Sequence, residues 1–170
     1  TVVNAGSRVE CPVCERHFRK FARFHGANDQ CPSCGSLMRH RAILLYLRDV
    51  LRLPETESDV LHVGPAAAIR QRLSSVSPLR YLSLDIDPAL ADVQGDVTDL
   101  RFRDASFDFL LCVHVLEHVP DDRAAIGELF RGFSGYVQAD AKSVYDSALR
   151  RGLVRQVGPP EPLMPISLAA

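Results

Sequence analysis

The sequence predicts an α/β fold in which a small cysteine-rich module precedes a parallel β-sheet. Two observations predict it. Four cysteines form two identical pairs near the N-terminus, and strand-like apolar runs alternate with helical runs from residue 60 onward. The 170 residues leave room for one such module and one modest domain. With 46% hydrophobic and 24% charged residues, the composition is typical of a globular chain.

The cysteine pairs Cys11/Cys14 and Cys31/Cys34 each enclose two residues, and sixteen residues separate the two pairs. This spacing is typical of a structural zinc site, because one tight turn directs two thiolates at the same ion and two such turns complete a tetrahedron. We therefore predict a four-cysteine zinc ribbon over residues 1–37, with these four cysteines as its ligands.

Two other interpretations of the cysteines agree less well with the sequence. Disulfides would need an oxidising compartment, and the first residues show no secretion signal. A thioredoxin-like redox pair needs one C-x-x-C, not two matched ones. Four thiolate ligands would leave the zinc ion no open position for catalysis. His17, His25 and His40 are then expected at the surface or beside the ligands, and His25 could replace a displaced cysteine.

Charge is distributed unevenly along the chain. Residues 1–52 hold nine Lys/Arg and four Asp/Glu, whereas residues 53–130 hold six and fourteen. The basic segment could bind nucleic acid or another polyanion, or it could form an ordinary solvated surface. Phe18, Phe21 and Phe24 alternate with basic residues and could stack on bases. A small ribbon also needs aromatic residues to cover its metal core, and we favour that interpretation.

A connecting helix is expected from Met38 to Leu53, because apolar residues recur there at helical spacing and Pro54 follows. The apolar positions are Ile43, Leu44, Leu47, Val50 and Leu51. The polar residues 55–59 then form a linker, so that residues 38–59 connect the ribbon to the next domain.

Beyond residue 60 we expect strands at 60–63, 81–86, 91–97 and 106–113, with helices at 66–73 and from Pro120 through Arg131. Such alternation implies a Rossmann-like parallel sheet that binds ligands at the carboxyl ends of its strands. Asp85 and Asp87 end the second expected strand, where a carboxylate can accept hydrogen bonds from ribose hydroxyls. The first turn lacks a full G-x-G-x-x-G, which argues against NAD and FAD.

Four stretches resemble the class I S-adenosylmethionine-dependent methyltransferases of the type 11-like group: 60–64, 84–88, 94–100 and 106–122. The last stretch is the most specific and is similar to small-molecule, lipid or quinone methyltransferases. A bacterial subgroup of this family carries the same ribbon in front of the domain. The resemblance runs from about Cys11 to Phe130 and implies S-adenosylmethionine as the methyl donor, with the methyl acceptor unknown.

The resemblance also implies roles for individual residues. Gly64 would let the backbone approach the methionine part of the cofactor, and Asp85 would bind the ribose, with Asp87 as the alternative. Asp96 and Val97 would frame the adenine, and His114 would lie near the methionine carboxylate or the sulfonium.

Ordinary structural roles compete with these assignments, since Asp96 and Asp99 could simply form turns and His114 and His118 could be turn and helix-start residues. No catalytic residue is assigned, although His114 or His118 could serve as a general base. Cys112 lies in an apolar strand and is expected to pack rather than to react.

The family pattern stops after Arg131. Residues 132–149 resemble a piece of a DDE insertion-sequence transposase, whose second catalytic carboxylate would fall at Asp140. The other carboxylates of such a site are absent, so Asp140 is not expected to be catalytic. Residues 158–170 are Pro-rich and are expected to be disordered. Residues 132–170 would thus be a transposase-like fragment and tail.

We therefore expect a C-terminally truncated methyltransferase domain over residues 60–131, and whether it retains activity is left open. The alternative is a non-enzymatic zinc-ribbon module that binds nucleic acid or protein. In either case we expect a cytoplasmic protein without a membrane partner.

Overall fold

The computed structural model describes residues 4–53 and 57–132 of the chain. The predicted transposase-like fragment and tail, including Asp140, lie outside the described residues. Two compact units make up the fold. Of the described residues, the first unit holds those up to Glu57 together with Ala66–Arg80, and the second holds Ser58–Pro65 and those from Tyr81 to Gly132.

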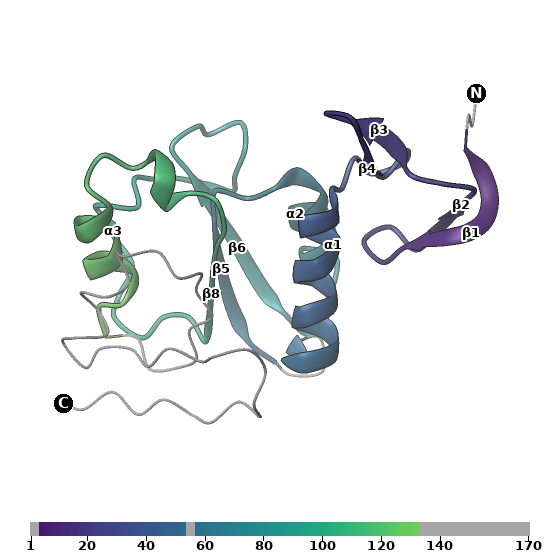
Figure 1. The fold of residues 1–170 in the computed structure, drawn as a ribbon. Coiled ribbons are helices and arrows are strands. Elements are labelled where there is room, and N and C mark those ends of the chain that lie inside the picture. Colours follow the sequence, from purple (N-terminus) through teal and green to yellow (C-terminus); the bar gives the residue numbers. More distant parts are fainter. Residues whose placement is uncertain (1–3, 54–56, 133–170) are drawn as a thin grey trace. The chain divides into compact units, whose positions relative to one another are not determined.

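Two antiparallel hairpins begin the first unit (Figure 1). The first pairs β1 (Ala5–Cys11) with β2 (Arg16–Phe18), and the second pairs β3 (Ala22–Phe24) with β4 (Ala27–Gln30). One cysteine pair forms the turn between β1 and β2, and the other follows β4. The Phe18 side chain is buried, so this aromatic residue belongs to the small core of the ribbon.

The connecting helix begins at Met38 as expected, but its second half differs from the prediction. Helix α1 (Met38–Leu45) continues into a π-helical segment, η1 (Tyr46–Val50), in which the Leu51 amide donates to the Tyr46 carbonyl at 3.1 Å. A π-turn holds more residues than an α-turn, so it rotates the positions that follow. Val50, predicted to face the core, is therefore 46% exposed. Helix α2 (Ala67–Leu73) contacts α1 within the same unit.

The second unit contains a four-stranded parallel sheet in the order β7-β6-β5-β8, which confirms the predicted α/β class (Figure 1). Its strands are β5 (Asp59–Val63), β6 (Arg80–Asp85), β7 (Val93–Gln94) and β8 (Phe109–Cys112). Val60 lies opposite Phe109, and Leu84 lies opposite Val93. The carboxyl ends of parallel strands meet at one edge, where the sequence predicts a ligand.

Two strands are shorter than predicted because side chains bond to the backbone at their ends. Strand β7 ends before Asp96, whose Oδ1 accepts from the Thr98 amide at 2.8 Å and forms a turn. Strand β8 begins three residues late, because Ala105 has a φ of 56° and the Ser106 hydroxyl donates to the Arg103 carbonyl at 2.7 Å.

Helix α3 (Asp122–Leu129) follows β8 after the 3₁₀ turn η3 (Leu116–His118). The Asp121 carboxylate caps it by accepting from the Ala124 amide at 2.9 Å. The buried core of this unit consists of Leu61, Val63, Leu84, Val97, Leu100, Leu116, Ala125, Ile126, Leu129 and Phe130. Within the described residues, none of the helices has the length and apolar character needed to cross a membrane.

Candidate metal centre and cofactor site

The four predicted zinc ligands converge on one point. Their sulfur atoms all lie within 4.8 Å of one another, with Cys11 Sγ 3.8 Å from Cys34 Sγ and Cys14 Sγ 3.7 Å from Cys31 Sγ. A tetrahedral ion with Zn–S bonds of about 2.3 Å requires sulfur atoms about 3.8 Å apart. The donor set therefore fits zinc in both chemistry and size. Among the described residues, no other three such side chains form a metal-binding group.

Both cysteine turns use the same backbone geometry. The Glu15 amide donates to the Cys11 carbonyl at 2.7 Å, and the Gly35 amide donates to the Cys31 carbonyl at 3.0 Å. The residue after each pair is left-handed, with φ of 57° at Glu15 and 71° at Gly35. Glycine adopts this conformation freely, whereas a residue with a Cβ loses about 1 kcal/mol there. The glycine at position 35 indicates a left-handed backbone in the sequence, whereas the glutamate at position 15 gives no such indication.

A buried serine contacts two of the sulfur atoms. Ser36 is fully buried, and its Oγ lies 3.3 Å from Cys11 Sγ and 3.2 Å from Cys34 Sγ. Burial alone would raise the pKa of Cys11, but hydrogen bonds from Ser36 and nearby amides outweigh it and lower that pKa to about 7. Burial raises the pKa of Cys31 to about 12. Without metal, Cys11 therefore gives up its proton more readily than Cys31.

Arg41 connects the metal centre to helix α1. Its side chain is buried and donates to the Asp29 carbonyl at 2.7 Å and to the Ser36 carbonyl at 2.8 Å. The guanidinium also lies 3.9 Å above the centre of the Phe21 ring. The Asp29 carboxylate accepts hydrogen bonds from both Arg41 and the Met38 amide, the first of α1. Arg41 is not among the apolar positions of the predicted connecting helix, and so sequence reasoning missed this role.

The phenylalanines of the ribbon, and two of its histidines, take part in packing or hydrogen bonding. Phe18 is buried, Arg41 covers a face of the Phe21 ring, and Phe24 packs edge-on against His25 with ring centres 4.3 Å apart. His40 Nδ1 accepts from the Leu37 amide at 3.2 Å, and His17 is exposed. None of the three histidines joins the sulfur cluster, and the core interpretation of Phe18 agrees with its burial.

In the second unit, Gly64 lies directly after β5 with a φ of 60°. Its amide donates to the Leu84 carbonyl at 2.9 Å, and a Cβ added to it would lie only 2.4 Å from Cγ2 of Val115. Only glycine therefore allows the turn after β5 to contact the turn after β8. The residue predicted to approach the methionine part of the cofactor thus lies at the meeting point of two strand ends.

Asp85 ends β6 and is half-buried. Its Oδ1 accepts from the Asp87 amide at 2.9 Å, and Asp87 Oδ1 accepts from the Ala89 amide at 2.9 Å. Both carboxylates make the same kind of turn bond, but Asp87 is exposed whereas Asp85 is half-buried, which favours Asp85 as the ligand-facing carboxylate. Ile86 lies between them and is 70% exposed, a residue that sequence reasoning missed. The position of Ile86 directly after the carboxylate that ends β6 was the feature of the sequence that could have drawn attention to this residue.

Asp96 and Val97 follow β7, the strand beside β6. The Gly95 amide donates to the Asp85 carbonyl at 2.9 Å, which holds the two strand ends together. The Thr98 amide and hydroxyl both donate to Asp96 Oδ1 at 2.8 Å and hold the pKa of Asp96 below its usual value. Asp96 thus has the turn-forming role that was the alternative to adenine binding, and it remains exposed. Val97 is buried in the core of this unit.

His114 follows β8 in a left-handed conformation, with a φ of 58°. Its Nδ1 lies 2.9 Å from Glu117 Oε1, and this hydrogen bond lowers the pKa of Glu117. A strained residue beside a carboxylate at the ligand-binding edge of a sheet is typical of functional positions. Cys112 lies within β8, where burial raises its pKa to about 12 and keeps it a neutral thiol. Sequence reasoning missed the partnership with Glu117.

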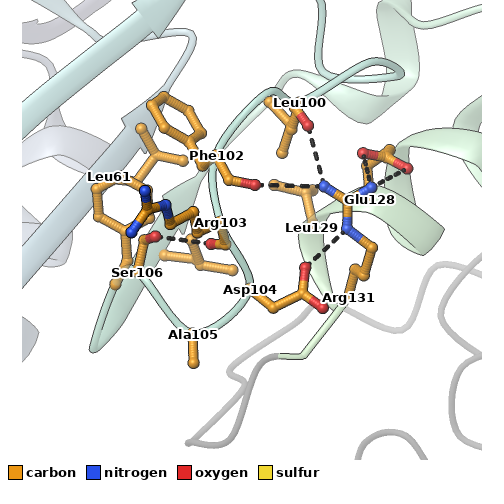
Figure 2. A pocket seen from close by; sticks show the side chains of 12 residues that line it. Leu61, Leu100, Phe102, Arg103, Asp104, Ala105, Ser106, Glu128, Leu129 and Arg131 are labelled. Carbon is orange, nitrogen blue, oxygen red and sulfur yellow. Dashed lines mark hydrogen bonds and ion pairs between the residues drawn. The ribbon is translucent and has the colours of Figure 1, made fainter.

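A small cavity of about 40 Å³ lies near the amino end of β8, away from these residues. Figure 2 shows Arg131 at its wall, donating to Asp104 Oδ1 at 3.0 Å, to the Leu100 carbonyl at 3.0 Å and to the Glu128 carboxylate. This volume can hold about one water molecule, far less than a nucleoside cofactor. The candidate cofactor site therefore stays at the carboxyl ends of the strands.

Residues 61–133 match a family model described as a methyltransferase domain, which covers slightly less than half of the chain. This match confirms the resemblance of this part of the chain to a methyltransferase domain. A search of curated proteins finds no match.

Three solved structures are similar to the chain. The YcgJ protein from Bacillus subtilis is 21% identical, with 64% of this chain and 62% of that chain covered and a TM-score of 0.40. A provisionally described methyltransferase from Bacillus halodurans C-125 is 16% identical, with 62% of this chain and 55% of that chain covered and a TM-score of 0.39. A provisionally described sarcosine dimethylglycine methyltransferase from Galdieria sulphuraria is 19% identical, with 66% of this chain and 53% of that chain covered and a TM-score of 0.42. The chain spans between about half and three fifths of the length of these proteins.

Proposed function

We propose that the second unit binds S-adenosylmethionine at the carboxyl ends of its strands and serves methyl transfer to an acceptor. The observation that carries this proposal is the pairing of two features on neighbouring strand ends. Gly64 forms a turn that admits no Cβ, and Asp85 places a half-buried carboxylate beside it. Backbone access and a ribose-binding carboxylate are what a nucleoside cofactor requires here.

Each candidate residue has a definite task in this proposal. Gly64 and His114 face the methionine part, and Asp85 accepts hydrogen bonds from the ribose hydroxyls. The exposed Ile86 side chain offers an apolar surface to the adenine ring. Asp96 and the Val97 amide then meet the polar edge of the adenine.

The cofactor supplies a methyl group already activated on a sulfonium, so the protein contributes mainly by orienting the reactants. In this proposal the Glu117 carboxylate accepts a hydrogen bond from the protonated Nδ1 of His114, which leaves Nε2 unprotonated and able to act as a base. The acceptor would then be a hydroxyl or amine that loses a proton as it is methylated.

Titration of S-adenosylmethionine into the full-length, zinc-loaded chain by calorimetry tests the proposal. Asp85→Ala should weaken binding by about tenfold or more, because two hydrogen bonds to a charged carboxylate are lost. Asp99→Ala is the matched control, since it removes an equal charge from a carboxylate that pairs with Arg101. Absence of binding, or equal binding by Asp85→Ala, would contradict the proposal.

We also propose that the sulfur cluster holds zinc and that the protein works in the reducing cytoplasm. All five cysteines lie in the part of the chain that the structure describes, and all are free thiols. Metal-binding thiols persist where disulfides do not form. Zinc analysis of the purified protein tests the first part, and one ion per chain, lost in a Cys31→Ser variant, is expected.

A second candidate function is a nucleic-acid-binding role for the zinc ribbon. The observation that favours it is a set of exposed cations beside a groove that contains no carboxylate. This function is independent of methyl transfer, because its residues belong to the other unit.

A further inference from the structure

The ribbon unit contains a groove of about 920 Å³ between its strands and the second cysteine turn. The groove is lined by Asn4–Gly6, Arg16–Phe18, Ala22, Gln30–Ser33 and Gly35. None of these residues is acidic. The volume lies in the range of pockets that hold small ligands, and so it can accommodate a few linked nucleotides but not a folded partner.

Cationic side chains lie on and beside the segment that lines this groove. Arg16 lines it, and Arg19, Lys20 and Arg23 follow on the connected turn and strand, all of them exposed. The backbone holds the basic turn close to the groove.

The contact that holds this turn is tight. The Arg19 amide donates to the Asn4 carbonyl at 2.8 Å, and a Cβ added to Gly6 would lie 2.9 Å from Arg19 Cα. The backbone of the basic turn is thus held at Arg19 against the strand that lines the groove.

Negative charges near the groove are few. Glu10 lies 3.7 Å from His17, and Glu15 pairs with Arg72. A zinc ion with four thiolates would add a net double negative charge. Of these four cysteines, Cys31 lines the groove, and it is 2% exposed. The cations lie at the surface, where an incoming polyanion meets them first. Salt screens the electrostatic interaction with charges more than about 10 Å away.

We propose that this groove binds single-stranded RNA through its phosphates, an inference that rests on the second candidate function. A single strand can enter a concave groove, whereas a duplex presents a convex surface. The polar side chains of Asn4, Gln30 and Ser33 line the groove and can pair with the 2′-hydroxyl that distinguishes RNA from DNA. Because the fold occupies Phe18 and Phe21, phosphate contacts rather than base stacking carry the affinity.

Fluorescence anisotropy with a labelled 12-nucleotide RNA of mixed sequence, titrated with the full-length zinc-loaded chain, tests the proposal. Three or four neutralised phosphates predict a slope of about −2 to −3 in a plot of log affinity against log salt, at about 0.7 per phosphate. The same RNA as a duplex and a DNA strand of equal sequence should both bind several-fold more weakly.

Three variants locate the binding. Arg16→Ala should weaken RNA binding about fivefold and reduce the salt slope by about 0.7. Ser33→Ala removes one of the groups proposed to pair with the 2′-hydroxyl, together with the 2.9 Å hydrogen bond from Arg16, but keeps the charge. It should therefore reduce the preference for RNA over DNA and leave the salt slope unchanged. Arg101→Ala removes an exposed arginine of the other unit and is the control for net charge. Equal affinity of Arg16→Ala and Arg101→Ala would overturn the assignment to this groove.

Further outcomes separate this inference from the cofactor proposal. No RNA binding at 50 mM salt, or tighter binding of duplex or DNA, overturns the RNA inference and leaves S-adenosylmethionine binding unaffected. Asp85→Ala should change the affinity for S-adenosylmethionine but not for RNA. Arg16→Ala should do the reverse. Chelation of zinc should abolish RNA binding, because Cys31–Ser33 supply a wall of the groove.

Discussion

Single residues in left-handed backbone positions show how this chain uses glycine. Gly35 has a φ of 71°, and a Cβ added to it would meet only the Gln30 side chain, at 3.9 Å. Gly35→Ala should therefore lower the free energy of unfolding by about 1 kcal/mol through backbone strain alone. Urea unfolding of the zinc-loaded protein measures this.

Gly127 supplies a control with the opposite sign. It lies within helix α3, and a Cβ there would meet nothing within 4 Å. Gly127→Ala should raise the free energy of unfolding by about 0.5–1 kcal/mol, because alanine is the better helix former. If both variants shifted stability in the same direction, the conformational explanation would be wrong.

Asp96 offers a test by pH at the same scale. The Thr98 amide and hydroxyl lower the pKa of Asp96, so their hydrogen bonds stabilise the fold above the unfolded pKa of about 3.9. That stability is lost as the pH falls through the folded pKa. Thr98→Val removes the hydroxyl and keeps the amide, so the pKa should rise while staying below its usual value. NMR titration of the carboxyl carbon measures it, and an unchanged pKa would exclude the hydroxyl as a cause.

At the scale of elements, Arg131 fastens the end of α3 to the loop before β8. It donates to the carbonyls of Leu100 and Phe102 and pairs with Asp104 and Glu128. Arg131→Lys should lower the free energy of unfolding by about 1–2 kcal/mol, because an ammonium group cannot reproduce the planar fork. Thermal unfolding measures this loss.

The control for Arg131 is Arg101, which is 88% exposed and pairs only with Asp99 among the bonds of the described chain. Arg101→Lys should change stability by less than about 0.5 kcal/mol. An Arg131→Lys variant as stable as Arg101→Lys would show that the four contacts of Arg131 contribute nothing.

The elements also show which features could be predicted. The convergence of the four cysteines could be predicted because each pair acts through one local turn, whose geometry the C-x-x-C spacing determines. Arg41 and Ser36 could not, because their partners lie elsewhere in the chain and helical periodicity marks a charged residue as exposed. Strands β7 and β8 were overestimated because side chain–backbone turns at Asp96 and Ser106 leave little trace in hydrophobic patterning.

At the scale of the whole molecule, the two compact units do not follow the order of the sequence. The sequence predicts domains made of consecutive residues, but residues 66–80 belong to the ribbon unit although they lie between strands β5 and β6 in the sequence. Linear segmentation could not reveal this, because the contact between α1 and α2 joins segments that are far apart in the sequence.

This division predicts how zinc removal propagates. Arg41 and Asp29 connect the second cysteine turn to α1, and α1 contacts α2. Structural zinc stabilises small domains by about 10 kcal/mol or more, so chelation should remove hydrogen-exchange protection from α1 and α2. Helix α3, in the other unit, should keep its protection. Loss of protection in all three helices, or in none, would show that the two units are not separate in stability.

Because α2 belongs to the ribbon unit, the unit's division in the sequence affects how genetic recombination can transfer the ribbon between proteins. A crossover at residue 57 would separate α1 from α2, whose Ile69 and Leu73 are almost fully buried. The ribbon is therefore not a cassette that one cut can transfer. An exchange between two related genes would preserve this unit only if residues 1–57 and 66–80 were inherited together.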